Sequence, residues 1–200
     1  MHWKLAEKSY FKPDAFRRNL NACIQSARSV KFVLQKCKAN FADFESWYAT
    51  WQDRMRADAL MKWAVNARNN IEKQGDLEAA STMRVTLVDS YIERDSIEFD
   101  LPPKTKPSEV ANIFINSPLR PERLSSDASL SVERRWVAST LPDHEILSAT
   151  AHGCRSLGNL VADAPGELGL PHVGSDESKP KCSLAPRQGR LRLIWTRTNR

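Results

Sequence analysis

Residues 13–38 read PDAFRRNLNACIQSARSVKFVLQKCK, and this stretch decides the fold class. Its apolar residues recur at steps of three and four, as they do along one face of an α-helix. They are Phe16, Leu20, Cys23, Ile24, Ala27, Val30, Val33, Leu34 and Cys37. Pro13 suits the first turn of a helix, where its missing N–H group costs no hydrogen bond. The spacing therefore predicts a long amphipathic helix.

Two further helices are predicted downstream. Residues 41–56 place their large apolar side chains on one side of a second helix. Asp58 suits the cap of a third helix over residues 59–73, because its carboxylate can accept hydrogen bonds from the first free N–H groups. Gly75 suits the left-handed conformation just past the end of that helix. We expect these three helices to pack antiparallel.

The apolar period changes after residue 80. Apolar residues alternate with polar ones from Met83 to Leu87 and again from Ile97 to Leu101, which predicts a hairpin with a four-residue turn at residues 93–96. The rest of the segment up to about residue 140 is predicted to be irregular. Within it, an apolar run at residues 110–115 is either a short helix after Ser108 or a buried turn.

A last helix is predicted over residues 143–164, with Asp143 as its cap, and it returns to the bundle. Pro and Gly then break the pattern throughout residues 165–200. The predicted fold is mainly α: an antiparallel helical bundle over residues 1–164, with a small β-hairpin insertion and irregular segment at about 83–140, and a disordered C-terminal tail. A run at residues 191–195 is able to form a short strand, but no partner strand is evident.

The net charge of +6 belongs to the tail. Residues 178–200 contain seven Lys or Arg and no acid, so residues 1–177 hold 23 basic and 24 acidic side chains. Such a tail is either solvated or binds nucleic acid or another polyanion nonspecifically. The sequence pattern also changes abruptly at about residue 165. This change leaves open that residues 165–200 are not a selected sequence, for example because of a frameshift.

No membrane association is predicted, because the sequence has no run of 18 apolar residues. The first residues lack the apolar core of a signal peptide, so the expected location is the cytoplasm. The four cysteines form no CxxC pair and the four histidines are scattered, so neither a metal site nor a cofactor is predicted. Cys23 and Cys37 share a predicted helix about 21 Å apart, too far for a disulfide, and free thiols are expected.

Arg68 and Asn69 stand near the end of the third predicted helix, and this arrangement resembles the HEPN family. Its members are small helical-bundle proteins, often dimeric, and many are metal-independent ribonucleases with an R-x(4–6)-H motif. Residues 44–48 and 74–77 also resemble bacterial HEPN-like proteins. The resemblance covers residues 13–77, with or without the last helix, and it implies a helical bundle with a homodimer seam.

Metal-independent RNA cleavage needs a group that releases and takes up protons near neutral pH, and histidine suits that role. Here Lys73 occupies the commonest histidine position. A lysine side chain in water has a pKa of about 10.4, so it holds its proton at neutral pH. The resemblance therefore implies a domain that does not cleave RNA, in which Arg68, Asn69 and Lys73 are at most weak catalytic candidates.

These residues have two interpretations. Either Arg68, Asn69 and Lys73 bind phosphate or RNA, or they only close a structural helix, with Lys73 favoured by the helix dipole and Arg68 paired with Glu72 or with an acid on a neighbouring helix. Arg134 and Arg135, next to a tryptophan, are a second phosphate-binding candidate or a plain surface helix end. The aromatic side chains Trp47, Tyr48, Trp51 and Trp63 are more typical of a core than of a base-stacking surface.

Two functional hypotheses follow. The first is a non-catalytic, HEPN-like helical interaction module that forms a homodimer or binds a partner protein. The second is an RNA-binding or metal-independent ribonuclease-related protein that uses Arg68, Asn69 and Lys73 on phosphate.

Overall fold

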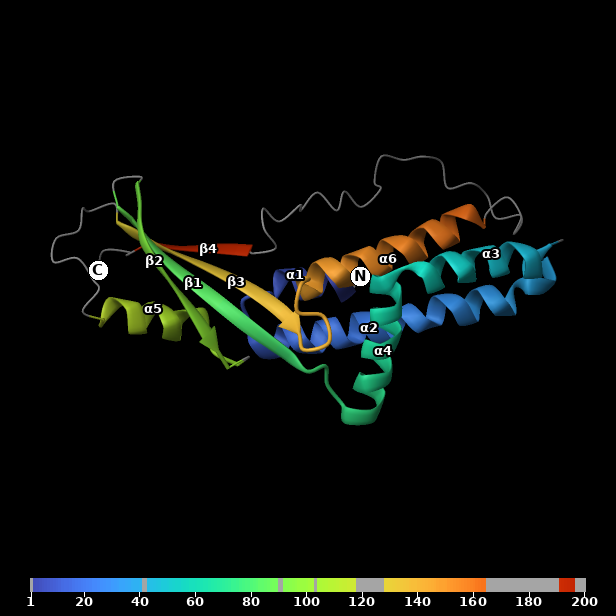
Figure 1. The fold of residues 1–200 in the computed structure, drawn as a ribbon, viewed down its shortest axis with the longest axis horizontal. Helices are drawn as coiled ribbons and strands as arrows, with labels where there is room; N and C mark the ends of the chain where they lie inside the picture. The colour runs from blue at the N-terminus through green and yellow to red at the C-terminus, as the bar shows by residue number, and fades with distance from the viewer. Residues whose placement is uncertain are drawn as a thin grey trace.

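The computed structural model describes residues 2–40, 43–89, 92–102, 104–117, 128–164 and 191–196 of the 200-residue chain. Helices form most of this part, which confirms the mainly α fold. They are α1 (His2–Lys8), α2 (Pro13–Lys36), the short 3-10 helix η1 (Lys38–Asn40), α3 (Phe44–Ala57), α4 (Ala59–Gln74), α5 (Pro107–Ile115) and α6 (Ile146–Asp163). The long helix α2 contacts α1, α4 and α6 (Figure 1).

Four antiparallel strands form one sheet in the order β2-β1-β3-β4. They are β1 (Ala79–Asp89), β2 (Ile92–Leu101), β3 (Ser129–Ala138) and β4 (Leu191–Thr196). The sheet extends to one side of the helices, and α5 lies beside it (Figure 1). The predicted hairpin is therefore confirmed as β1 and β2, and β3 and β4 widen it into a larger sheet.

Several local predictions about the sheet were wrong. Glu93 pairs with Val88 and Ser96 with Thr86, so the residues predicted as a turn belong to β2 and the chain reverses between Asp89 and Ile92. The segment predicted to be irregular contains strand β3. Strand β4 does have a partner, because it pairs with β3 in antiparallel register. Of the predicted tail, residues 165–190 and 197–200 lie outside the described residues.

The helix boundaries follow the sequence signals closely. Asp58 accepts from the backbone N–H groups of Leu60 and Met61 at 2.8 and 3.1 Å, and Gly75 ends α4 in the left-handed region at φ 82°, as predicted. Residues 110–115 belong to a helix, which settles the alternative left open there. The predicted cap Asp143 is wrong, because the carboxylate of Glu145 caps α6 instead.

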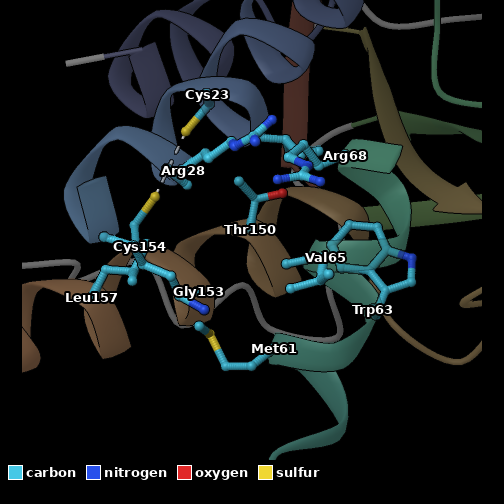
Figure 2. A pocket seen from close by; sticks show the side chains of 14 residues that line it. Cys23, Arg28, Met61, Trp63, Val65, Arg68, Thr150, Gly153, Cys154 and Leu157 are labelled. Atoms are coloured by element: carbon cyan, nitrogen blue, oxygen red, sulfur yellow. Dashed lines mark hydrogen bonds between the residues drawn. The ribbon is translucent and has the colours of Figure 1, made fainter. Parts of the chain in front are cut away.

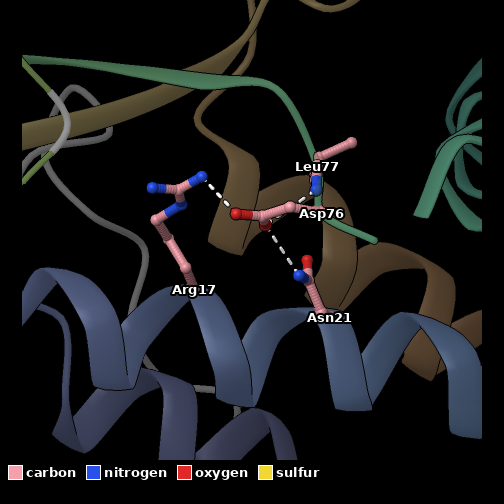
Figure 3. Close-up of polar contacts among 4 residues, drawn as sticks. All are labelled: Arg17, Asn21, Asp76 and Leu77. Carbon is pink, nitrogen blue, oxygen red and sulfur yellow. Dashed lines mark hydrogen bonds and ion pairs between the residues drawn. The ribbon is translucent and has the colours of Figure 1, made fainter. Parts of the chain in front are cut away.

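The exit from α4 is fixed onto α2 by Asp76, the residue after Gly75 (Figure 3). Its carboxylate is bound by Arg17, accepts from Asn21 Nδ2 at 2.7 Å, and accepts from the backbone N–H of Leu77 at 2.8 Å. Two of these donors come from α2. The carboxylate therefore holds the start of the first strand against the long helix.

Among the described residues, the buried apolar side chains form three clusters in series. The central cluster joins α1, α2, α4 and α6 to the nearer ends of β1 and β3, and includes Phe16, Ile71 and Trp136. A distal cluster lies among α2, α3, α4 and α6. A third lies between the sheet and α5. The central cluster thus joins the helices to the near ends of two strands, and the far part of the sheet has its own core against α5.

Arg134 separates the central cluster from the sheet cluster. It lies on β3 between Val132, which belongs to the sheet cluster, and Trp136, which belongs to the central one, and it is fully buried. Its guanidinium donates to Ser81 Oγ at 2.8 Å and to the carbonyl of Thr105 at 3.0 Å. It also lies over the Trp136 ring, 3.9 Å from the centroid, as in a cation–π contact.

Tyr10 extends this polar layer to the helices. Its hydroxyl lies 3.1 Å from the backbone carbonyl of Arg134 and 3.1 Å from Glu145 Oε1, while its own carbonyl accepts from Trp136 Nε1 at 3.1 Å. Glu145 in turn accepts from the N–H of Ser148 at 2.7 Å. The start of α6 is therefore hydrogen-bonded through Tyr10 to strand β3.

Replacing Arg134 by alanine should destabilise the protein strongly. The change leaves a cavity and removes the donors to Ser81 and Thr105, so the free energy of unfolding should fall by about 3 kcal/mol or more. Urea denaturation measures it. The control is Arg135→Ala, the neighbour on the same strand, whose guanidinium donates to the exposed Pro142 carbonyl. Arg135→Ala should lower the free energy of unfolding by no more than about 1 kcal/mol. If the two variants lost equal unfolding free energy, this role of Arg134 would be contradicted.

Glu145 should make stability depend on pH. Burial raises the pKa of its carboxyl above the usual value, although hydrogen bonds from the Leu147 and Ser148 backbone oppose the shift. Deprotonation then costs more in the folded than in the unfolded state. The stability linked to this group is complete below the unfolded pKa of about 4.3 and is lost as the pH rises through the folded pKa.

Glu145→Gln removes this titration and keeps one amide oxygen as an acceptor. Its unfolding free energy should rise relative to that of the parent protein as the pH increases from about 4 to 7. Urea titrations across this range measure the difference. The exposed Glu109→Gln, which also loses a carboxylate at a helix start, is the matched control. A constant offset between the parent and Glu145→Gln at every pH would contradict the prediction.

Candidate functional site: a groove between α2, α4 and α6

An apolar groove of about 90 Å³ lies where α2, α4 and α6 meet. Figure 2 shows its side chains converging from the three helices. It lies at the boundary of the central and distal clusters, since Ile24 and Trp63 belong to the first and Met61 and Leu157 to the second. The junction of two cores therefore leaves a hollow on the surface of the helical part.

The groove wall is mostly aliphatic and aromatic. Ile24, Met61 and Trp63 are buried there, whereas Val65 on α4 keeps 46% of its surface exposed. Gly153 on α6 keeps the hollow open: a Cβ at this position would lie 3.8 Å from Met61 Sδ, an ordinary contact, and a longer side chain would extend further into the groove. The site thus presents apolar surface to an incoming group.

Three cationic side chains line the same groove: Arg28 and Lys31 from α2, and Arg68 from α4. Arg28 and Arg68 share one acid, Glu72, at N···O distances of 3.2 and 3.7 Å. Within the described residues Lys31 has no ion pair. Burial lowers the pKa of Lys31, and the positive charges of Arg56 and Arg68 lower it further. The groove therefore carries excess positive charge.

Two cysteines also line the groove. Cys23 on α2 and Cys154 on α6 lie with their sulfur atoms 3.6 Å apart (Figure 2). Cys23 is buried, whereas Cys154 is exposed. The pair was not predicted from the sequence. Both residues occupy the apolar stripes of their predicted helices, but their contact depends on how α2 and α6 pack, which the stripes alone do not determine.

The structure separates the residues predicted to bind phosphate. Arg68 lines the groove, and its guanidinium donates to Asn69 and pairs with Glu72. Lys73 is exposed and is not among the groove residues. The three residues are therefore not all brought together in this groove, and the predicted pairing of Arg68 with Glu72 is present.

The second phosphate-binding candidate does not form a surface pair. Arg134 is fully buried, so a phosphate in solution cannot reach its guanidinium in this structure. The reason is that β3 directs alternate side chains inward, and Arg134 stands at an inward position. Arg135 is half-buried and donates to the carbonyl of Pro142 at 3.1 Å. Neither residue lies at a helix end.

The aromatic residues have mixed environments. Tyr48 and Trp63 are buried, as expected for core residues, and Trp63 donates to Thr140 Oγ1 at 3.1 Å. Trp47 and Trp51 are half-buried, and their indole N–H groups both donate to Asp163, at 2.9 and 2.7 Å. These two tryptophans join α3 to the end of α6.

The described part of the chain contains no cluster of three or more His, Cys, Asp or Glu side chains with metal-site geometry. None of the helices in those ranges combines the length and the apolar character that a membrane span requires. The cytoplasmic location stays a prediction.

Comparison with known proteins assigns the chain to a different family from the one predicted. The family model described as "Bacteriophage lambda protein ea47" matches residues 1–199. Protein ea47 of Escherichia phage lambda is 39% identical over 173 residues, which cover 80% of this chain. The chain spans only 41% of the length of that relative. No solved structure matches the chain.

The HEPN resemblance is therefore wrong. It rested on Arg68 and Asn69 with the flanking residues 44–48 and 74–77, whereas the ea47 match extends over nearly the whole sequence. Arg-Asn pairs near a helix end are common, and in this chain the pair is joined to Glu72. The match also includes residues 165–199, which argues against an unselected tail. The chain belongs to the phage lambda ea47 family.

Proposed function

We propose that the chain is a non-catalytic interaction module whose α2/α4/α6 groove binds an acidic amphipathic helix of a partner protein. One observation carries the proposal: the groove combines an apolar wall with three cationic side chains, Arg28, Lys31 and Arg68. An acidic amphipathic helix has the complementary features, an apolar face with carboxylates at its sides.

The size of the groove favours an anchoring side chain over a free small molecule. Pockets that enclose drug-sized ligands measure roughly 300–1,000 Å³. An apolar cavity of about 150 Å³ holds benzene. The groove volume of about 90 Å³ is smaller than either. A Leu or Val side chain from a partner suits this space, and buried anchors of this kind carry much of the energy of protein interfaces.

The charge of the groove favours an acidic partner. Glu72 is the one acid that pairs with Arg28 and Arg68, and Lys31 has no ion pair among the described residues. Carboxylates at the rim would compensate the positive charge that lowers the pKa of Lys31. Complementary charges of this kind steer association and exclude cationic partners.

Apolar surface continues around the groove. Val65 lies in its wall with 46% of its surface exposed, and Phe32 on α2 is 47% exposed with its ring 4.8 Å from the Arg28 guanidinium carbon. A helix laid along the groove would cover both the hollow and this rim. Helix-in-groove binding uses apolar side chains at i, i+3, i+4 and i+7 in this way.

A synthetic peptide of about 15 residues tests the proposal, long enough to form a marginal helix. It carries Leu along one face and Glu at the sides, and fluorescence anisotropy measures its binding. Val65→Glu places a carboxylate in the apolar wall and should weaken binding about tenfold or more, as expected when burial of one anchor is lost. Gly153→Leu, which fills the groove without changing its charge, should have a similar effect.

The matched controls are the same two kinds of substitution, Val to Glu and Gly to Leu, at positions outside the groove. Val33→Glu changes an exposed valine of α2, and Gly158→Leu changes a glycine of α6 that has nothing within 4 Å of its Cβ position. Both should bind the peptide like the parent protein, and a peptide with Lys at the sides should not bind. The proposal would be refuted if the groove variants and the control variants lost peptide affinity equally. It would also be refuted if the parent protein did not bind the Glu peptide.

Two other outcomes would identify a different occupant. If single-stranded RNA binds instead, and Arg68→Ala abolishes this binding while neutralising Lys179 and Lys181 in the tail does not, the RNA-binding hypothesis replaces the peptide one. If sedimentation shows a dimer that Val65→Glu dissociates, the groove is occupied by a second copy of the chain. Both outcomes overturn the proposed partner.

A further inference from the structure

Cys23 and Cys154 form a preorganised pair of thiols across two helices. They are 131 residues apart in sequence, yet their sulfur atoms lie 3.6 Å apart. A disulfide bond is about 2.05 Å long, so the sulfur atoms have to approach by roughly 1.5 Å to join. Both residues are on helices that already pack against each other, α2 and α6. The contact therefore places a second thiol where it can react with the first.

The two thiols differ in a way that assigns them different roles. Cys154 is the more exposed residue of the pair, and its hydrogen bond with Cys23 lowers the pKa of Cys154 to about 7, although partial desolvation of the sulfur opposes this. Cys23 is 5% exposed, and the same hydrogen bond together with burial raises its pKa. The exposed Cys154 is therefore the sulfur that a reagent in solution reaches first, and the buried Cys23 lies behind it.

Cys37 provides the internal comparison. It is a half-buried free cysteine at the end of α2, and among the described residues it has no sulfur partner. The Cys23–Cys154 pair also lacks the third ligand that a thiolate metal site would need, because no group of three metal-binding side chains occurs in the described residues. The arrangement is typical of an attacking thiol beside a resolving thiol.

We propose that Cys154 and Cys23 form a hydroperoxide-reactive dithiol, in which Cys154 is the attacking and Cys23 the resolving cysteine. The Cys154 thiolate attacks the terminal oxygen of the hydroperoxide, the O–O bond breaks, and the alkoxide takes up a proton to leave as an alcohol. Cys154 becomes a sulfenic acid. Cys23 sulfur then attacks the Cys154 sulfur, the S–O bond breaks, and hydroxide leaves with the Cys23 proton as water.

In total, two thiols are oxidised to one disulfide, and one hydroperoxide is reduced to one alcohol and one water. The product is a covalent bond between α2 and α6 in the groove wall. The reaction requires no groove ligand, so the inference is independent of the proposed binding function.

Hydrogen peroxide is the probe, added to the full-length protein at pH 7. Mass spectrometry of the digested protein should show a peptide pair joined through Cys23 and Cys154, and the oxidised protein should unfold at a higher temperature than the reduced one because the cross-link restricts the unfolded chain. Cys154 should be consumed faster than Cys37, because Cys154 is exposed and in contact with a second thiol, whereas Cys37 is half-buried and has no sulfur partner among the described residues.

Single substitutions separate the two roles. Cys23→Ser keeps a hydrogen-bond donor and should stop the reaction at the sulfenic acid of Cys154, which dimedone traps. Cys154→Ser should remove the fast phase and leave Cys23 unreacted. Cys37→Ser and Cys182→Ser are the matched controls and should leave the Cys23–Cys154 product unchanged.

Three results would overturn the inference. They are a disulfide that involves Cys37 or Cys182, a product that links two chains, and equal reaction rates for Cys154 and Cys37. The parent protein alone gives these readouts, so the test does not depend on the folding of any variant.

Discussion

The guanidinium of Arg134 lies where solvent does not reach, so protein atoms have to satisfy it. Burial lowers the pKa of this group to about 10, which still leaves it charged at neutral pH. Its partners come from separate parts of the chain: the Ser81 hydroxyl on β1, the Thr105 carbonyl before α5, and the Trp136 ring on β3. A buried charge without such partners is strongly unfavourable. The contact therefore fixes where the sheet, α5 and the helices meet.

The same polar layer also sets the position of α6 relative to the other helices. Tyr10 joins the backbone of Arg134 to the carboxyl of Glu145, and Glu145 caps the first turn of α6. From this fixed end, α6 extends past α2 and α4 toward the distal cluster, where Trp47 and Trp51 bind Asp163 at its far end. The groove lies between these two attachments. These attachments hold the two ends of α6, which forms one wall of the groove.

Helices α2, α3, α4 and α6 were predictable because their signals are local, whereas the short helix α1 was not predicted. Apolar stripes, the Asp58 cap and the glycine at position 75 act within a few residues, and the structure reproduces them. Strand β3 was missed because Arg134 interrupts the alternation of Leu130, Val132, Trp136 and Ala138, which made an inward position look solvated. The Asp143 cap failed because Glu145 is held by the distant Tyr10. The thiol pair and the groove are formed by residues on different helices that are far apart in sequence. They depend on how the helices pack, so no local sequence pattern predicts them.

Arg68 shows how geometry changes the meaning of a motif. Along the chain, Arg68 and Asn69 looked like part of a catalytic pattern that lacks its histidine. In three dimensions the relevant neighbours of Arg68 are Glu72 and the other cations of the groove, Arg28 and Lys31. Their charges come from two helices and meet in one groove. The positive charge is therefore a property of the three-helix junction, and it is the feature on which the proposed binding of an acidic partner rests.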